Sequence, residues 1–139
     1  MKLVILDRDG TINEDRDDYV KSPAEWVPIP GSLEAIARLN HAGWHTVIAT
    51  NQSGLARGLL DISALNAIHA RMNRELAEVG GRIDAVFFCP HTASEQCECR
   101  KPAPGLMRNV PSSVVTTPDR CKRWRRSRSR STTSSTRSW

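Results

Sequence analysis

Three short apolar runs alternate with two amphipathic helix patterns, and this order limits the folds that the chain can adopt. The apolar runs cover residues 2–6, 44–50 and 83–89. The helix patterns cover residues 32–42 and 63–79, where apolar side chains recur every three or four positions. Strand, helix, strand, helix, strand predicts parallel β-α-β units with right-handed connections. We therefore expect an α/β fold, a three-layer Rossmann-like arrangement with helices on both faces of a parallel sheet.

The ends of these segments carry start and stop signals. Residues 2–6 lack alternating polar side chains, which fits a strand buried on both faces. Ser32 is expected to cap the first helix and Gly43 to end it. Gly80 and Gly81 follow the second helix pattern and predict its end.

Polar motifs follow the three predicted strands. They read DRDGT from Asp7, TNQSG from Thr50 and CPH from Cys89. The carboxyl ends of parallel strands meet at one edge of a sheet, and ligands bind there. These segments are therefore expected to form one site.

Asp7 and Asp9 lie two residues apart in the turn after the first strand. Two close carboxylates repel each other unless a cation neutralises them, which indicates a hard divalent ion such as Mg²⁺. A carboxylate beside Mg²⁺ can also attack phosphorus. A local turn or capping role for both residues is the alternative, because Asp is common in turns.

Three short motifs in order resemble those of one enzyme superfamily. LDRDGT is similar to the first motif of the haloacid dehalogenase-like phosphatases, ATN to the second and RKP to the third. The resemblance implies that Asp7 is the nucleophile and Asp9 the general acid/base, with the Asp9 backbone carbonyl also reaching Mg²⁺. It implies that Thr50 and Lys101 bind the phosphoryl oxygens, where charge accumulates during phosphoryl transfer.

The loop CPHTASEQCEC gathers soft metal ligands. Cys89, His91, Cys97 and Cys99 have the number and type expected of a closed, structural Zn²⁺ site. Such a site would rigidify the loop just before Lys101. Thiols without a metal are the alternative. A disulfide between Cys97 and Cys99 is not expected, because it would close a small, strained ring.

This loop narrows the resemblance to the branch that contains heptose bisphosphate and histidinol phosphate phosphatases. TNQSGLARG and the segment KSPAEW at residues 21–26 are similar to the heptose side of that branch. The resemblance covers about residues 2–108 and implies that there is no large cap domain. It implies removal of the 7-phosphate of a soluble heptose bisphosphate, through an aspartyl-phosphate, in heptose synthesis for lipopolysaccharide.

The same resemblance implies further substrate contacts. They come from the loop over the active site, from the second motif and from the residue before Lys101. These residues are Asp15, Asp18, Asn51, Gln52, Ser53 and Arg100. His41, His45 and His69 lie on helix or strand patterns and are expected to be surface or packing residues.

Charge divides the 139 residues into two parts. Residues 1–110 carry 12 Lys and Arg against 14 Asp and Glu, whereas residues 111–139 carry eight against one. We expect a partial phosphatase domain over residues 1–110 and a separate Arg/Ser-rich tail over residues 111–139. The acidic domain has no feature suited to nucleic acid, so only the tail would favour RNA or DNA.

The family continues with a further strand and a fourth motif, GD followed by Asp, which completes the Mg²⁺ site. No such motif follows here. Either the tail is a genuine nucleic-acid-binding arm, or it is the family's alanine-rich C-terminal part read in a shifted frame, which is the interpretation that we favour. The domain is then expected to be incomplete at its C-terminus and to have weak activity or none.

Apolar runs are too short for a membrane span, which needs roughly 20 residues, and the N-terminal run is too short for a signal peptide. We therefore expect a cytoplasmic protein with no membrane partner. It is also expected to be a monomer.

Overall fold

A mostly parallel sheet forms the centre of the molecule. The computed structural model describes residues 2–109 and 123–124. The strands follow the order β1-β2-β3-β4; the first two pairs are parallel and the last is antiparallel. Their bounds are Lys2–Leu6 for β1, Trp44–Asn51 for β2, Ala85–Cys89 for β3 and Arg123–Trp124 for β4. The three predicted strands are confirmed, and the short antiparallel β4 was not predicted.

The register of the sheet brings the three strand ends to the same edge. Leu6 pairs with Ile48, and Asn51, the last residue of β2, pairs with Cys89, the last residue of β3. The segments that follow β1, β2 and β3 therefore begin side by side, as the polar motifs predicted.

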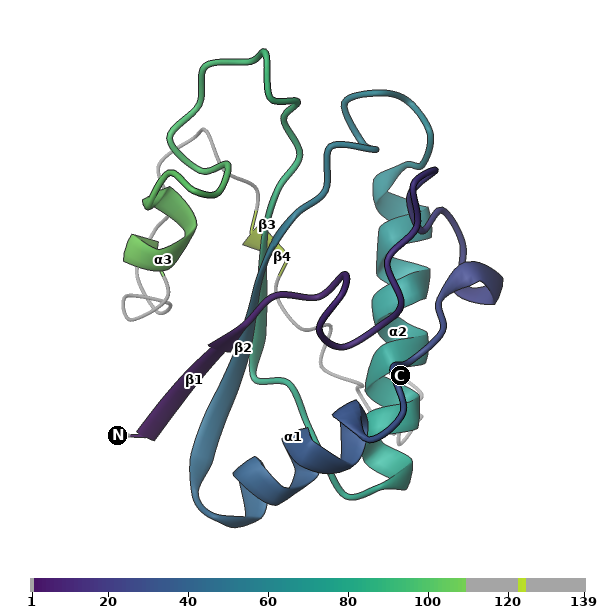
Figure 1. Cartoon of the computed structure of the whole chain (residues 1–139), viewed down its shortest axis with the longest axis vertical. Coiled ribbons are helices and arrows are strands. Elements are labelled where there is room, and N and C mark those ends of the chain that lie inside the picture. Colours follow the sequence, from purple (N-terminus) through teal and green to yellow (C-terminus); the bar gives the residue numbers. More distant parts are fainter. Residues whose placement is uncertain (1, 110–122, 125–139) are drawn as a thin grey trace, which may run out of the picture.

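Helices cover both faces of the sheet (Figure 1). On one face, α1 (Ser32–His41) and α2 (Ile62–Glu78) pack against the sheet through the larger apolar core, and a 3-10 turn, η1 (Pro23–Glu25), contacts α2. On the other face, the short α3 (Gly105–Asn109) contacts β3, and its Leu106 belongs to a second apolar cluster with Val47 and Phe87. The three-layer α/β architecture is thus confirmed. None of the helices in the described part of the chain is long and apolar enough to cross a membrane.

The helix ends differ slightly from the prediction. Ser32 was expected to cap α1, and this was wrong: Gly31 occupies the cap position with φ +85°, and the Ser32 hydroxyl donates to the carbonyl of Ile12 at 2.7 Å. The second helix begins at Ile62, one residue early, because the Asp61 carboxylate accepts the backbone N–H of Ala64 at 2.7 Å. In both cases a polar side chain, Ser32 or Asp61, forms a hydrogen bond that the helix pattern in the sequence did not predict.

The first strand is an edge strand. We expected residues 2–6 to be buried on both faces, but the structure contradicts this, since Lys2 and Ile5 are exposed and the other three residues are half-buried. Within residues 2–109 and 123–124, only β2 pairs with β1. Apart from β4, the tail over residues 111–139 lies outside the described residues.

Candidate functional site

A cavity of about 650 Å³ opens at the carboxyl ends of the strands. It gathers residues from the turn after β1, the loop that follows this turn, the end of β2 and the segment before α3. The lining residues are Asp7, Asp9, Asp15, Arg16, Asp17, Tyr19, Thr50, Asn51, Ser53, Arg100, Lys101 and Pro102. Eight of the ten residues expected to act on the substrate therefore line one cavity, while Gln52 and Asp18 do not.

Asp7 and Lys101 face each other in this cavity. The Lys101 Nζ lies 3.0 Å from Asp7 Oδ1, and the Asp7 side chain is 45% exposed. The same carboxylate oxygen accepts the backbone N–H of Arg8 at 2.8 Å. An accessible carboxylate beside a cation is the arrangement that a nucleophile and a phosphate-binding group require.

Asp9 is held more firmly than Asp7. Its Oδ1 accepts from Arg8 Nε at 2.9 Å and from Asn13 Nδ2 at 3.0 Å, and it lies 2.8 Å from Arg8 Nη2. Its Oδ2 accepts from Gln52 Nε2 at 3.0 Å. The Gln52 amide also donates to Thr50 Oγ1 at 3.0 Å, so Gln52 orients two site residues from behind the cavity wall.

The backbone at Lys101 is tied to the end of β2. The Asn51 side chain accepts the Lys101 N–H at 2.9 Å and donates to the Lys101 carbonyl at 3.1 Å. These bonds join residues that are 50 positions apart in the chain. The lysine is thereby placed next to the aspartate at the end of the neighbouring strand β1.

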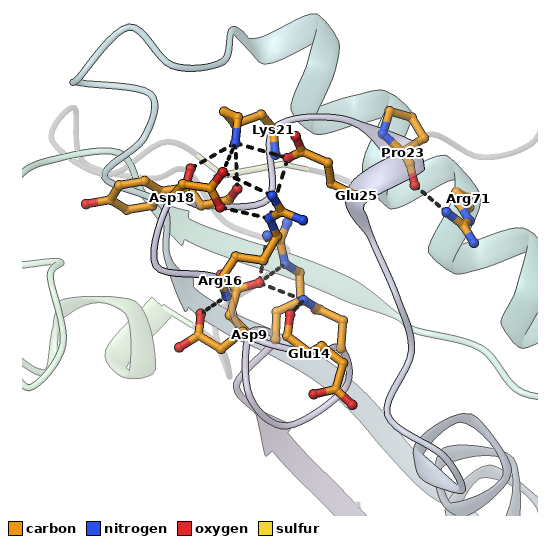
Figure 2. A network of polar contacts seen from close by, with 12 residues as sticks. Asp9, Glu14, Arg16, Asp18, Lys21, Pro23, Glu25 and Arg71 are labelled. Atoms are coloured by element: carbon orange, nitrogen blue, oxygen red, sulfur yellow. Dashed lines mark hydrogen bonds and ion pairs between the residues drawn. The ribbon is translucent and has the colours of Figure 1, made fainter.

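Ion pairs organise the loop that leads from Asp9 to η1 (Figure 2). Asp18 accepts two hydrogen bonds from Arg16, at 2.9 and 3.0 Å, and one from Lys21 at 2.9 Å. The hydrogen bonds from Arg16 and then from Lys21 hold the pKa of the Asp18 carboxyl well below its usual range. Its carboxylate is thus engaged within the loop, whereas Asp15 and Asp17 line the cavity.

The far end of this loop is anchored on α2. An Arg71 guanidinium N–H donates to the carbonyl of Pro23, as Figure 2 shows. The guanidinium carbon also lies 5.6 Å from the ring centre of Trp26, which is fully buried. The loop is therefore held at both ends, and the residues facing the cavity keep a defined position.

Tyr19 belongs to the cavity wall, although the sequence analysis did not single it out. Its backbone has φ +65°, an uncommon conformation for a residue with a side chain. Ser53 Oγ donates to the Tyr19 hydroxyl at 3.4 Å, and this bond, followed by the charges of Arg57 and Arg100, lowers the pKa of the phenol. The only signal in the sequence was that this is the single tyrosine of the chain, in a strongly acidic loop.

The four predicted zinc ligands come together beside the cavity. Their ligand atoms all lie within 4.8 Å of one another. Cys89 Sγ lies 3.3 Å from His91 Nδ1 and 3.6 Å from Cys97 Sγ, and His91 Nδ1 lies 3.3 Å from Cys99 Sγ. Tetrahedral bond lengths of about 2.0 to 2.3 Å give ligand separations of roughly 3.3 to 3.8 Å, so these three contacts fit such a site.

Cys89, Cys97 and Cys99 are not joined in disulfides. Cys99 Sγ lies 2.9 Å from Cys89 Sγ, which is shorter than a tetrahedral edge and far longer than a disulfide bond of about 2.05 Å. Burial raises the pKa of the Cys89 thiol to about 11. A thiolate in this position therefore needs a cation, and the ligand set of three sulfurs and one imidazole matches Zn²⁺.

The parallel sheet and the placement of Asp7, Asp9 and Lys101 define a phosphatase domain of the haloacid dehalogenase-like type. Residues 2–121 match the family described as polynucleotide kinase 3 phosphatase, and the chain belongs to this family.

Two curated relatives have the same name, D-glycero-beta-D-manno-heptose-1,7-bisphosphate 7-phosphatase. The protein from Bordetella bronchiseptica is 61% identical over 110 residues, which is 79% of this chain and 62% of the relative. The protein from Pseudomonas aeruginosa is 55% identical over 108 residues, which is 78% of this chain and 61% of the relative. The chain thus spans about three fifths of the length of these relatives.

A crystal structure of D,D-heptose 1,7-bisphosphate phosphatase from B. bronchiseptica, complexed with magnesium and phosphate, has a similar fold. The TM-score is 0.80 at 59% identity, over 82% of this chain and 64% of the other. This agreement confirms the expected family and architecture.

Proposed function

We propose that this chain carries the catalytic site of a phosphomonoesterase that removes the 7-phosphate of D-glycero-D-manno-heptose 1,7-bisphosphate. The observation that carries the proposal is the meeting of Asp7, Lys101 and the firmly held Asp9 in one cavity. The names of the relatives support the choice of substrate. Histidinol phosphate is the competing substrate, and phosphate release from each compound separates the two.

The proposed reaction has two steps. An oxygen of the Asp7 carboxylate attacks phosphorus, the bond from phosphorus to the sugar oxygen breaks, and Asp9 gives that oxygen a proton. Water then gives a proton to Asp9 and attacks the phosphorus, and the bond to Asp7 breaks, releasing inorganic phosphate. Lys101 and Thr50 would stabilise the phosphoryl oxygens during both steps.

The described residues fit Mg²⁺ in part. Asp7 offers an exposed carboxylate at the cavity, whereas the Asp9 carboxylate is occupied by Arg8, Asn13 and Gln52. We therefore assign the Asp7 carboxylate and the backbone carbonyl of Asp9 as the ligands from this part of the chain. Bound there, Mg²⁺ would neutralise charge on the phosphoryl group, and it commonly keeps several waters.

The proposed zinc is structural, because four protein ligands leave no open position. Cys89, His91, Cys97 and Cys99 would hold the loop whose end carries Arg100 and Lys101. Arg100 donates to the carbonyl of His91 at 3.2 Å, so the loop also places the arginine that we assign to substrate recognition. Cysteines that are not joined in disulfides are typical of a reducing compartment, so we propose a cytoplasmic location.

We also propose that activity is weaker than in the longer relatives. In the described part of the chain, β1, which leads to Asp7 and Asp9, pairs with a strand on one side only. An edge strand positions the residues that follow it less firmly than a strand bonded on both sides. The place of the reaction in lipopolysaccharide precursor synthesis is part of the same proposal.

Phosphate release from the heptose bisphosphate in the presence of Mg²⁺ tests the function. Asp7→Asn should abolish release, because an amide cannot form the aspartyl-phosphate. Asp61→Ser is the matched control, since it removes a carboxylate while keeping a residue that caps α2. Equal rates for the wild type and Asp7→Asn would refute the proposed nucleophile, and no release by the wild type would refute the activity of this chain.

A further inference from the structure

Arg8 is a buried cation between the two aspartates of the site. Its side chain is 0% exposed. Burying a charge is unfavourable unless the charge is paired and hydrogen-bonded. The partners of the Arg8 guanidinium therefore indicate which side chains it positions. One side of the guanidinium meets the Asp9 carboxylate, and Nη1 lies 3.1 Å from His69 Nε2, on α2.

The hydrogen bond with Arg8 determines the protonation state and the tautomer of His69. A guanidinium can only donate, so Nε2 of His69 accepts the proton of Arg8 Nη1. The ring is then neutral with its own proton on Nδ1. Burial, with the charge of Arg8 as a second cause, lowers the pKa of His69 well below its usual value, which agrees with a neutral ring.

The two oxygens of Asp9 have unequal surroundings. Oδ1 faces Arg8 Nε, Arg8 Nη2 and the Asn13 amide, all within 3.0 Å. Oδ2 accepts a hydrogen bond from the Gln52 amide at 3.0 Å. The first oxygen is therefore saturated with donors and has no room to carry a proton. The second retains lone-pair capacity at the cavity that Asp9 lines.

The turn itself is built around the same residue. The Arg8 carbonyl accepts the backbone N–H groups of Thr11, Ile12 and Asn13 at 3.2, 2.8 and 3.3 Å. This closes the turn and brings the Asn13 amide back to Asp9 Oδ1. Both the backbone and the side chain of Arg8 thus act on the geometry of Asp9.

We propose that Arg8, held by neutral His69 of α2, is a positioning residue that orients the Asp9 carboxylate so that Oδ2 is the oxygen that exchanges the proton. The inference rests on the proposed function of Asp9 as general acid/base. It gives α2 a role in the reaction, because the imidazole at its centre restrains the guanidinium that fixes Asp9.

Three variants test the positioning role through kinetics. His69→Leu removes the acceptor for Arg8, His69→Gln restores an acceptor oxygen, and Met72→Leu is the control, a fully buried, volume-conserving change one turn further along α2. We expect His69→Leu to lower kcat by about 10- to 100-fold with little change in KM. His69→Gln should recover most of that loss, and Met72→Leu should behave like the wild type. Equal kcat values for His69→Leu and Met72→Leu would overturn the proposal.

NMR provides a readout that does not depend on turnover. In the intact wild-type chain, ¹⁵N spectra should show His69 as the neutral tautomer protonated on Nδ1, and the Arg8 Nε–H should exchange slowly. The ¹³C signal of the Asp9 carboxyl should shift in His69→Leu and stay in place in Met72→Leu. If the wild type releases no phosphate, the proposed function fails, and these spectra alone decide the positioning role.

Two spectral results would contradict that role. They are a His69 ring protonated on Nε2 at neutral pH, or an Asp9 carboxyl signal that is unchanged in His69→Leu. Should His69→Leu fail to fold, the tautomer in the wild type and the properties of His69→Gln still decide the outcome.

Discussion

The Asn51 side chain forms two hydrogen bonds with the backbone of Lys101, one as acceptor at 2.9 Å and one as donor at 3.1 Å. This pair ties the last residue of β2 to the loop that follows the Cys/His cluster. Because Lys101 Nζ lies 3.0 Å from Asp7 Oδ1, the pair also sets the distance between the proposed phosphate-binding cation and the proposed nucleophile.

Asn51→Ala should lower kcat/KM for the heptose bisphosphate by about 100-fold, because a misplacement of about 1 Å at a reacting group has an effect of this size. Asn51→Asp keeps an acceptor for the Lys101 N–H and should lose less. Asn66→Ala, on α2 and outside the cavity lining, serves as the control. Wild-type kcat/KM in Asn51→Ala would show that the two hydrogen bonds do not position Lys101.

Lys101→Gln should reduce kcat by about 10²- to 10³-fold, since it removes a cation aimed at charge that develops in the transition state. Lys101→Arg keeps the charge and should recover part of the rate. The measurement is initial phosphate release at saturating substrate, with Arg108→Gln on α3 as a control that removes a cation elsewhere. A loss confined to KM would instead assign Lys101 to ground-state binding.

The helices and strands that could be predicted are those marked by a pattern of apolar residues within the segment itself. Apolar runs located β1, β2 and β3 closely, and the strand order followed from alternation with helices. The exposure of β1 was missed because an apolar run reports that a strand can be buried and not whether a neighbour covers it.

The residues of the candidate site also fall into two groups, those that a local sequence motif predicts and those that depend on tertiary contacts. Asp7, Thr50 and Lys101 belong to short motifs, and the sequence alone predicts that they lie in one site. Arg8 could not, because its contact with His69 spans 61 positions and depends on both side chains being buried. Tyr19 owes its place to a positive φ, which no sequence pattern around it requires.

Zinc content tests the Cys/His cluster. The purified chain should hold one Zn²⁺, and Cys99→Ser should lose it, because Cys99 is a fully buried member of the cluster. Metal loss should also lower the unfolding midpoint and the activity, since Lys101 follows the cluster directly. Cys121→Ser, which removes a cysteine that the proposed site does not use, should keep the metal. Wild-type protein with clearly less than one zinc per chain would rule out the assignment.

Stability should depend on pH through His69. The folded pKa of this buried ring lies well below the value of about 6.5 in an unfolded chain, because burial and the charge of Arg8 disfavour the protonated form. Below pH 6.5 the unfolded state therefore binds a proton that the folded state does not. The stability from the neutral ring is fully present above pH 6.5 and is lost as the pH falls toward the folded pKa.

His69→Gln should remove this dependence. Between pH 7.5 and 5.5 the wild type should lose about 1 kcal/mol more free energy of unfolding than His69→Gln, as measured by urea titration at constant ionic strength. His41→Gln, which replaces an exposed histidine at the end of α1, should keep the wild-type slope. If His69→Gln and the wild type lose the same free energy over this range, then His69 takes up a proton in the folded state, and its role as a neutral acceptor for Arg8 is excluded.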